Sequence, residues 1–276
     1  MKKVFYWILA ILITFAAIIY QRRTGPTYDK RVSVVIDDTA YKFKLVRSFG
    51  GDQDCKVELV VPDQEVKGYI EYRKFPTDHD WTKIEMSRQY DNIGGYLPNL
   101  PPAGKYEYKV TLVKNGKEYH LNEGKPVLIR FKGHVPESIL FPHIFFMFFA
   151  MLLSNLAGIM AVFKNKRYRF YTNVTLIALF VGGMILGPWV QWYAFGEAWA
   201  GVPFAWDLTD NKTLVAFLFW LLAFFMNRKK ERPTYTIVAS IIMLMVYSIP
   251  HSMYGSQLDP ETGEIIQGWI QLFLIY

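Results

Sequence analysis

Apolar runs long enough to cross a bilayer constrain this chain more than any other feature of its sequence. The clearest run is Ile139–Phe163, and Val4–Tyr20 and Phe170–Trp192 are two more. Lys212–Met226 and Tyr235–Pro250 are shorter and need their flanks to approach the roughly 20 residues of a spanning helix. Hydrophobic residues make up 52% of the chain and aromatic residues 17%, more than in an ordinary soluble domain. The sequence therefore predicts an integral membrane α-helical protein with about five transmembrane helices.

Basic residues predict the orientation of these helices. The loops Lys164–Phe170 (KNKRYRF) and Asn227–Pro233 (NRKKERP) each carry four Lys or Arg, whereas residues 193–211 and 251–268 carry none. Because basic loops stay in the cytoplasm, we expect both basic loops to face inward. Residues 193–211 and 251–268 would then face outward, together with residues 21–136. The net charge of +7 is explained by such loops, and we expect the bilayer, rather than nucleic acid, as a partner.

The N-terminal residues 1–21 predict a signal-anchor helix in the cytoplasmic (inner) membrane. Lys2 and Lys3 precede an apolar core, as in a signal peptide, but no small-x-small cleavage site follows. We therefore expect an uncleaved helix with its N-terminus in the cytoplasm. The single Cys55 has no second cysteine with which to form a disulfide or a zinc site.

Residues 28–132 predict an extracytoplasmic all-β domain between the first and second helices. Seven short runs rich in Val, Ile, Tyr and Phe are separated by turn residues, and Asn115-Gly116 is a strong hairpin signal. This spacing indicates a β-sandwich. Leu100–Val110 (LPPAGKYEYKV) resembles the entry into the tyrosine-corner strand of immunoglobulin-like and fibronectin-type domains, and Gly68–Met86 is similar to their C–C′ region. The resemblance implies a spacer or a partner-docking module.

Small and polar residues inside the apolar runs indicate a compact bundle, placed in residues 137–276. Asn155, in the middle of the second helix, should face protein rather than lipid. Gly158, Gly182, Gly183 and Gly187 should allow close approach between helices.

A tryptophan-rich outer loop, residues 193–212, lies between the third and fourth helices. Trp189, Trp192, Trp199 and Trp206 supply half of the eight tryptophans of the chain. Tryptophan is enriched at membrane interfaces for anchoring alone, so anchoring and packing are one interpretation. Asp207, Thr209 or Asp210 would cap the fourth helix, and Lys212 would extend to the head groups.

Two histidines share the depth of this loop in the predicted topology. His143 lies at the outer end of the second helix and His251 at the outer end of the fifth, and each follows a proline. One interpretation is that they form interfacial hydrogen bonds. The other is that they ligate a metal, because haem iron takes axial imidazoles and the ring needs aromatic walls.

The outer loop and these histidines resemble the tryptophan-rich WWD proteins, which handle haem in cytochrome c maturation. The stretch FGEAWAGVPFAWDLTDNKTL contains a glycine, Trp199 and Trp206-Asp207, followed by polar residues and a helix. That family also places histidines before and after its Trp-rich loop. The resemblance implies haem as cofactor, with an outer-face site built from axial ligands and a platform: His143, His251, Trp199, Phe204, Trp206 and Asp207.

Three hypotheses for function follow from these observations. The first is haem binding or haem handling in cytochrome biogenesis. The second is a non-catalytic subunit or assembly factor of a larger membrane complex, whose β-sandwich docks a membrane or extracytoplasmic protein partner. The third is a membrane enzyme that uses Glu197, Asp207 or Asp210. The sequence favours a protein that is not an enzyme, because these three acids have no His or Cys cluster beside them.

Overall fold

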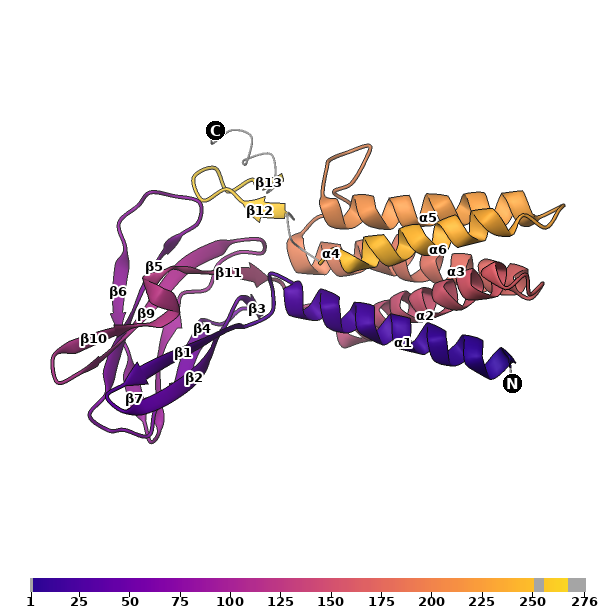
Figure 1. Cartoon of the computed structure of the whole chain (residues 1–276). Coiled ribbons are helices and arrows are strands. Elements are labelled where there is room, and N and C mark those ends of the chain that lie inside the picture. The colour runs from indigo at the N-terminus through magenta and orange to yellow at the C-terminus, as the bar shows by residue number, and fades with distance from the viewer. Residues whose placement is uncertain (1, 251–255, 268–276) are drawn as a thin grey trace. The chain divides into compact units, whose positions relative to one another are not determined.

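The computed structural model describes residues 2–250 and 256–267 of the chain (Figure 1). They belong to two compact units, a helical one and a β one, each with its own core. Helix α1 comes first, strands β1–β11 follow it, and helices α2–α6 and the hairpin β12–β13 complete the described order.

The β unit contains Thr27–His134 and Ser256–Ile266. Its elements are β1 (Lys30–Ile36), β2 (Thr39–Leu45), β3 (Ser48–Gly50), β4 (Cys55–Val60), β5 (Lys67–Lys74), β6 (Thr82–Glu85), β7 (Ser87–Gln89), β8 (Asn92–Leu97), β9 (Lys105–Lys114), β10 (Lys117–His120), the short helix η1 (Leu121–Gly124), β11 (Val127–Lys132), β12 (Ser256–Leu258) and β13 (Ile265–Gln267).

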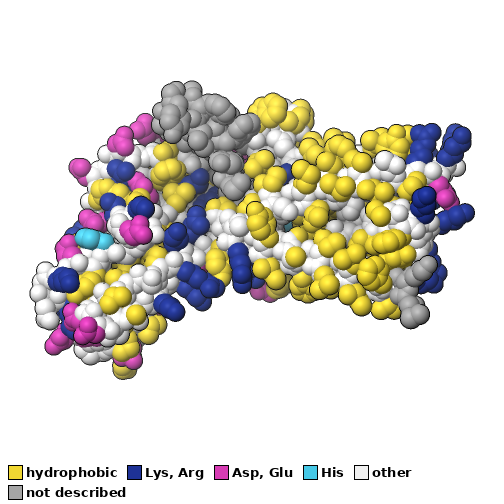
Figure 2. Space-filling view, viewed as in Figure 1, with side chains coloured by type: hydrophobic (Ala, Val, Ile, Leu, Met, Phe, Trp, Pro, Cys, Tyr) yellow, Lys and Arg dark blue, Asp and Glu magenta, His cyan; other side chains and the backbone are white. Residues whose placement is uncertain are grey.

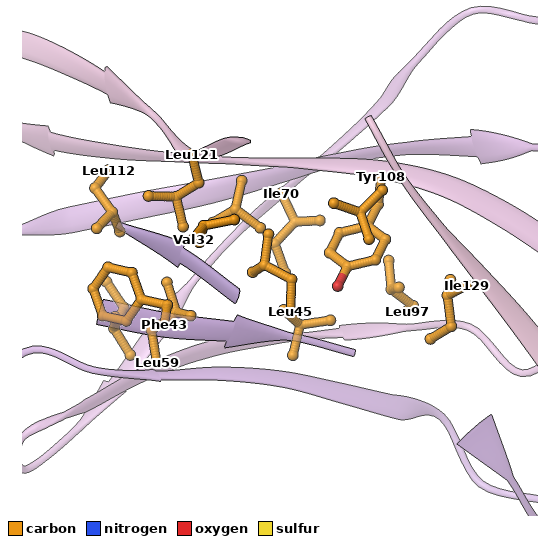
Figure 3. Close-up of a cluster of buried hydrophobic side chains, with 14 of the residues drawn as sticks. Val32, Phe43, Leu45, Leu59, Ile70, Leu97, Tyr108, Leu112, Leu121 and Ile129 are labelled. Atoms are coloured by element: carbon orange, nitrogen blue, oxygen red, sulfur yellow. The ribbon is translucent and has the colours of Figure 1, made fainter. Parts of the chain in front are cut away.

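These strands form sheets that enclose one core. The largest sheet has the order β3-β11-β9-β5-β6, with β10 also paired to β9; β4-β8-β7 and β1-β2 form separate ladders. In β2 and β4 alternate residues face inward, as expected from the two-residue period of a strand. Figure 3 shows buried side chains from several strands meeting in this core. The largest buried side chains in this core include Tyr108, Phe131, Leu59 and Ile70.

Strand β8 was not among the seven predicted strands because glycines interrupt its sequence, NIGGYL. Close packing excludes a side chain at Gly94 and crowds one at Gly95. A Cβ on Gly94 would lie 2.9 Å from the Val57 carbonyl oxygen, and a Cβ on Gly95 would lie 3.0 Å from Ile70 Cδ1. A pair of glycines normally indicates a turn, but here it lies in a strand. Another backbone and another sheet pack tightly against that strand.

Tyr108 of strand β9 is buried within the β unit. Its hydroxyl donates to the Val46 carbonyl oxygen at 2.8 Å, 62 residues earlier in the chain. Tyr108 therefore ties β9 to the segment after β2.

The hairpin β12–β13 corrects the predicted boundary of the helical region, which ran from 137 to 276. Residues 256–266 belong to the β unit. The Leu258 amide donates to the Ala103 carbonyl at 3.1 Å, and Lys105 Nζ donates to Gln257 Oε1 at 2.6 Å. These bonds attach the hairpin to the start of β9.

Lys105 should make the stability of the β unit depend on pH. Burial, helped by the nearby positive charge of Arg130, lowers the pKa of Lys105 to about 7. The pKa of a lysine in the unfolded chain is about 10.4. Between about pH 7 and pH 10, Lys105 is therefore protonated in the unfolded chain and neutral in the folded one. The free energy of unfolding should rise as the pH increases across this range. Thermal unfolding of the full chain across this range should show that rise. Lys105→Met should remove it, whereas Lys67→Met, at an exposed position, should retain it; an equal slope in both variants would contradict the prediction.

The helical unit contains long apolar helices, of which four are long and apolar enough to cross a membrane. Its elements are α1 (Lys2–Thr24), α2 (Glu137–Val162), α3 (Tyr168–Leu179), the π-helical segment η2 (Phe180–Leu186), α4 (Gly187–Phe195), α5 (Leu208–Asn227) and α6 (Pro233–Ser248). The segments α3, η2 and α4 form one of the four continuous candidates, Tyr168–Phe195.

Of the five predicted spanning helices, α6 is shorter than the four that are long and apolar enough to cross a membrane. It has 16 residues, which at 1.5 Å per residue make about 24 Å, less than the roughly 30 Å of a hydrocarbon core. The prediction took in Ile249 and Pro250, but Pro250 breaks the helical pattern and the helix ends at Ser248.

Buried polar contacts and small residues hold these helices together. The Asn155 amide donates to Thr14 Oγ1 at 2.9 Å, so Asn155 faces helix α1, as predicted. Trp220 is fully buried, and its indole nitrogen approaches Met243 Sδ to 3.0 Å. Gly158 meets Ser240 of α6, where an added Cβ would lie 2.4 Å from Ser240 Oγ. These contacts join α2 to α1 and α6, and α5 to α6.

The two basic loops lie together at one end of the helices. The Arg169 guanidinium donates to the Arg228 carbonyl at 3.1 Å, and the Tyr168 hydroxyl donates to Asn227 Oδ1 at 2.6 Å. Figure 2 shows apolar side chains along the helices and Lys and Arg side chains gathered at this end. At the other end, Lys212 Nζ donates to the Ile249 carbonyl at 2.7 Å. Lys212 is buried, so it does not extend to head groups as predicted.

Candidate functional site

The outer loop, residues 196–207, starts where helix α4 ends. Gly196 has φ 82° and its amide donates to the Trp192 carbonyl. This left-handed conformation strongly favours glycine. The glycine therefore turns the chain sharply away from α4 and into the loop.

Asp207 ends the loop and caps helix α5. Its Oδ1 accepts hydrogen bonds from the Thr209 amide at 2.7 Å and the Asp210 amide at 3.3 Å. These amides have no partner inside the helix, so the carboxylate satisfies them. One of the three predicted capping residues is thus confirmed. The Asp207 amide also donates to the Ala200 carbonyl at 2.7 Å, which closes the loop.

Two further side chains from the first turn of α5 hold the loop in place. Asp210 Oδ2 accepts from the Ala200 amide at 2.6 Å and from Gln191 Nε2 at 2.9 Å. Asn211 Oδ1 accepts from the Val202 amide at 2.8 Å. Because Asp207 and Asp210 are both buried, these bonds are little weakened by competition with water. The loop is therefore fixed to α5 and to α4, which carries Gln191.

The predicted aromatic platform is divided among different surroundings. The Trp199 indole nitrogen donates to the Val202 carbonyl at 3.2 Å, so Trp199 is part of the loop's own structure. Phe204 is 81% exposed and Trp206 is 59% exposed. Of these three aromatic residues, Trp206 alone lines the groove described next.

An apolar groove of about 590 Å³ lies between the loop and helix α5. Its lining side chains are apolar apart from one amide: Val202, Trp206, Leu208, Asn211, Leu214, Val215 and Leu218. The α5 residues recur three or four positions apart and therefore share one helix face. A volume between about 300 and 1,000 Å³ is typical of small-molecule sites. The groove is consequently large enough for a flat apolar ligand.

The ring of His143 is oriented by one hydrogen bond to the backbone of the π-helical segment η2. Its Nδ1 lies 2.9 Å from the Gly182 carbonyl oxygen, so the hydrogen bond assigns the proton to Nδ1 and leaves the Nε2 lone pair as acceptor. A backbone carbonyl bonded to the second ring nitrogen is the usual support of a histidine ligand. Gly182 belongs to the π-helical segment η2, and short π-helical segments often mark functional sites.

The structure does not bring all predicted site residues into one described cluster. His143 contacts Gly182, whereas Trp206 lines the groove along α5, and the lining of that groove does not include His143. His251 lies outside the described residues. Within residues 2–250 and 256–267, no group of three or more His, Cys, Asp or Glu could hold a metal ion.

The acidic residues of the loop act mainly as hydrogen-bond acceptors. Asp207 and Asp210 bind backbone amides, as described above. Burial, followed by the negative charge of Asp207, raises the pKa of Glu197. This arrangement gives Asp207 and Asp210 a structural role at the start of helix α5.

Sequence reasoning missed Gln191 and Asn211 as supports of the loop and missed the π-helical segment. An amide near a helix end has no distinctive pattern, and three glycines in LFVGGMILGP were the sole signal near η2.

No protein-family model matches the chain, and the search of curated proteins finds no match.

Proposed function

We propose that this chain is a polytopic membrane protein that binds a flat, largely apolar ligand in the groove between loop 196–207 and helix α5. In this proposal the helices cross the cytoplasmic membrane with the N-terminus inside. The β unit, an immunoglobulin-like domain by its sequence resemblance, and the loop are then extracytoplasmic. The groove opens at the outer face, where a ligand can enter from the bilayer.

The observation that carries this proposal is the preorganised loop. The capping residue Asp207 and two side chains of α5, Asp210 and Asn211, accept hydrogen bonds from loop or helix-start amides, and Val202 and Trp206 lie beside the apolar face of that helix. A Cβ on Gly201 would lie 2.8 Å from Asp210 Cβ, so the loop backbone itself packs against α5. A loop fixed before the ligand arrives loses little entropy on binding. Anchoring in lipid alone does not require this construction.

Haem is the ligand of this class that the sequence resemblance implies. His143, whose Nδ1 donates to a backbone carbonyl, has an Nε2 that could bind iron, but it does not line the groove, so His143 and the groove are separate candidates for contact with haem. Trp206 fits the role of an aromatic wall. Asp207 and Trp199 support the loop instead of facing a ligand directly. Bound haem would supply redox chemistry or be passed on as cargo, and the protein residues would hold and orient it.

Hemin titration of the detergent-purified chain tests the groove. Filling it with Val215→Trp should weaken hemin binding at least about tenfold, because the new indole occupies the space that a ligand needs. Val238→Trp on α6 is the matched control, because Val215 is 41% exposed and Val238 is 39% exposed, and it does not line the groove. Quenching of tryptophan fluorescence and the Soret band report binding. Equal affinity in both variants would contradict the groove as the site.

Iron ligation is tested separately from the groove. A Soret band that His143→Ala shifts or weakens, and that Val238→Trp leaves unchanged, would show that His143 ligates the iron although it does not line the groove. If His143→Ala has the wild-type spectrum while Val215→Trp loses binding, the groove stands and His143 is not the ligand. If neither change matters and the chain from haem-replete cells carries no haem, the haem assignment is wrong.

A second candidate function is that of a non-catalytic subunit or assembly factor. The observation that favours it is an exposed apolar surface on the ladder β4-β8-β7. Tyr90, in the turn between β7 and β8, is 87% exposed, and Val60 and Tyr96 are also exposed. Exposed aromatic residues are frequent anchors of protein interfaces. Extraction from native membranes in mild detergent should then give a complex that Tyr90→Ala with Tyr96→Ala dissociates; a lone monomer before mutation would contradict this function.

A further inference from the structure

The largest sheet of the β unit carries a small polar pocket, which we call the β5–β9 pocket. Its volume is about 230 Å³, and its lining comes from strands β5, β9 and β10 and from the turn η1: Glu71, Lys109, Val110, Thr111, His120 and Gly124. All of these residues belong to the β unit. The pocket is therefore a feature of this unit by itself.

Strand register places the polar side chains of the pocket on one face of the sheet. Glu71 lies directly opposite Lys109, and His120 lies directly opposite Thr111. Lys109 and Thr111 are two residues apart on β9, so they share a face. Val110 between them is buried in the core. The pocket consequently lies on the side of the sheet that points away from the core.

Glu71 and Lys109 are opposed across the two strands without forming an ion pair. On the same two strands Arg73 lies opposite Glu107, and these two side chains do pair, as is stabilising for opposite charges on neighbouring strands. Lys109 Nζ instead lies 4.2 Å from the centroid of the Trp81 ring, over which Arg73 also lies. This cation–π contact holds the ammonium group beside the tryptophan.

A second lysine also leaves the Glu71 carboxylate unpaired. Lys83 of β6 lies directly opposite Glu71 on its other side. The Lys83 ammonium pairs with Glu85 at 3.2 Å and lies 3.7 Å from the centroid of the Tyr69 ring. Within the described part of the chain, Glu71 thus forms an ion pair with neither of the two lysines that flank it. The pocket keeps one carboxylate and one ammonium group apart.

Thr111 and His120 add groups that can form hydrogen bonds. Thr111 Oγ1 and His120 Nδ1 lie 3.0 Å apart. His120 Nε2 lies 3.8 Å from Glu118 Oε2, which is too far for a hydrogen bond. The Thr111–His120 contact fixes the imidazole ring at the wall of the pocket.

A turn in an uncommon backbone conformation brings Gly124 to the pocket. Asn122, Glu123 and Gly124 have φ angles of 53°, 56° and 74°. Residues other than glycine seldom adopt this left-handed conformation, and it is concentrated at functional sites. The Lys125 amide donates to the Asn122 carbonyl at 3.0 Å and holds the turn. A Cβ on Gly124 would lie 3.9 Å from His120 Cβ, so the turn packs beside the imidazole.

We infer that the β5–β9 pocket binds a small zwitterion of the size of a free α-amino acid. The ammonium group of the ligand would donate to the Glu71 carboxylate, and its carboxylate would accept from the Lys109 ammonium. Charge-assisted hydrogen bonds of this kind are the strong ones. The volume lies below the range of about 300–1,000 Å³ that is typical of drug-sized ligands, so it suits a molecule with few heavy atoms. This inference rests neither on the groove nor on the proposed membrane location.

Saturation-transfer NMR of L-alanine with the detergent-purified full chain tests this inference. L-alanine should bind, whereas acetate and methylammonium, which each carry one of the two charges, should bind at least about tenfold more weakly. This comparison uses the wild-type chain, so it does not depend on the folding of any variant. Binding of acetate or of methylammonium as tight as that of L-alanine would overturn the inference, as would the absence of L-alanine binding.

Substitutions assign the binding to the pocket. Glu71→Gln and Lys109→Gln should each weaken L-alanine binding at least about tenfold, because each removes one charged partner. The matched controls are Glu65→Gln and Lys67→Gln, which make the same changes of charge at exposed positions outside the pocket and should retain binding. Wild-type affinity in both Glu71→Gln and Lys109→Gln, or equal losses in the controls, would overturn the assignment. Hemin binding is measured separately, so failure of the groove leaves this test intact.

Discussion

Gly158→Ala is expected to destabilise the helical unit by about 1–3 kcal/mol, the usual cost of forcing extra volume into a packed interior. An added Cβ would lie 2.4 Å from Ser240 Oγ and 2.6 Å from Ser240 Cβ. Ser240 cannot simply turn away, because its Cβ is fixed to the α6 backbone and its hydroxyl donates to the Ser154 carbonyl at 3.0 Å. Helices α2 and α6 would have to separate.

Thermal unfolding in detergent, followed by loss of the monodisperse peak, measures this effect. Gly187→Ala is the matched control, because its Cβ would meet atoms no closer than 3.6 Å. The double variant Gly158→Ala with Ser240→Gly removes the clashing atoms and should recover much of the lost stability. A wild-type melting temperature for Gly158→Ala alone would show that α2 and α6 do not approach this closely.

The sequence predicted most of the helical region because the length and composition of apolar runs decide it. Glycine was informative in the helical region. Gly158 allows the close approach between helices that its position in an apolar helix suggested. In the β unit the same residue type misled, since Gly94 and Gly95 lie inside β8. A glycine in a strand and a glycine in a turn look alike until the neighbouring backbone is known.

The candidate site was predictable only where one residue acts on its own helix. Asp207 caps the residues that follow it, so its role can be read locally. The bonds from Asp210 to Ala200 and from Asn211 to Val202 span a loop, and the contact of His143 with Gly182 joins two helices. Such contacts depend on tertiary packing. The sequence therefore placed His143 and Trp206 at one depth, whereas their described contacts are separate.

Asp210→Ala is expected to release the outer loop and weaken ligand binding in the groove together. The substitution removes the acceptor of the Ala200 amide, at 2.6 Å, and of Gln191 Nε2, at 2.9 Å. Because the Ala200 amide is buried, leaving it without an acceptor costs about 1–3 kcal/mol. The native loop conformation should lose stability by that amount, and with it the positions of Val202 and Trp206 above α5.

Hydrogen exchange separates this effect from a simple loss of charge. Peptides containing Ala200 should exchange about tenfold faster in Asp210→Ala, since 1.4 kcal/mol corresponds to a factor of ten. Asp210→Asn keeps a side-chain oxygen that can accept the Ala200 amide, and it should retain most of the protection. Hemin affinity should follow the same order, with the wild type above Asp210→Asn and Asp210→Ala below both. Unchanged exchange at Ala200 in Asp210→Ala would mean that the carboxylate does not hold the loop. Faster exchange with unchanged hemin affinity would mean that the loop is held for another purpose and that the ligand does not occupy the groove.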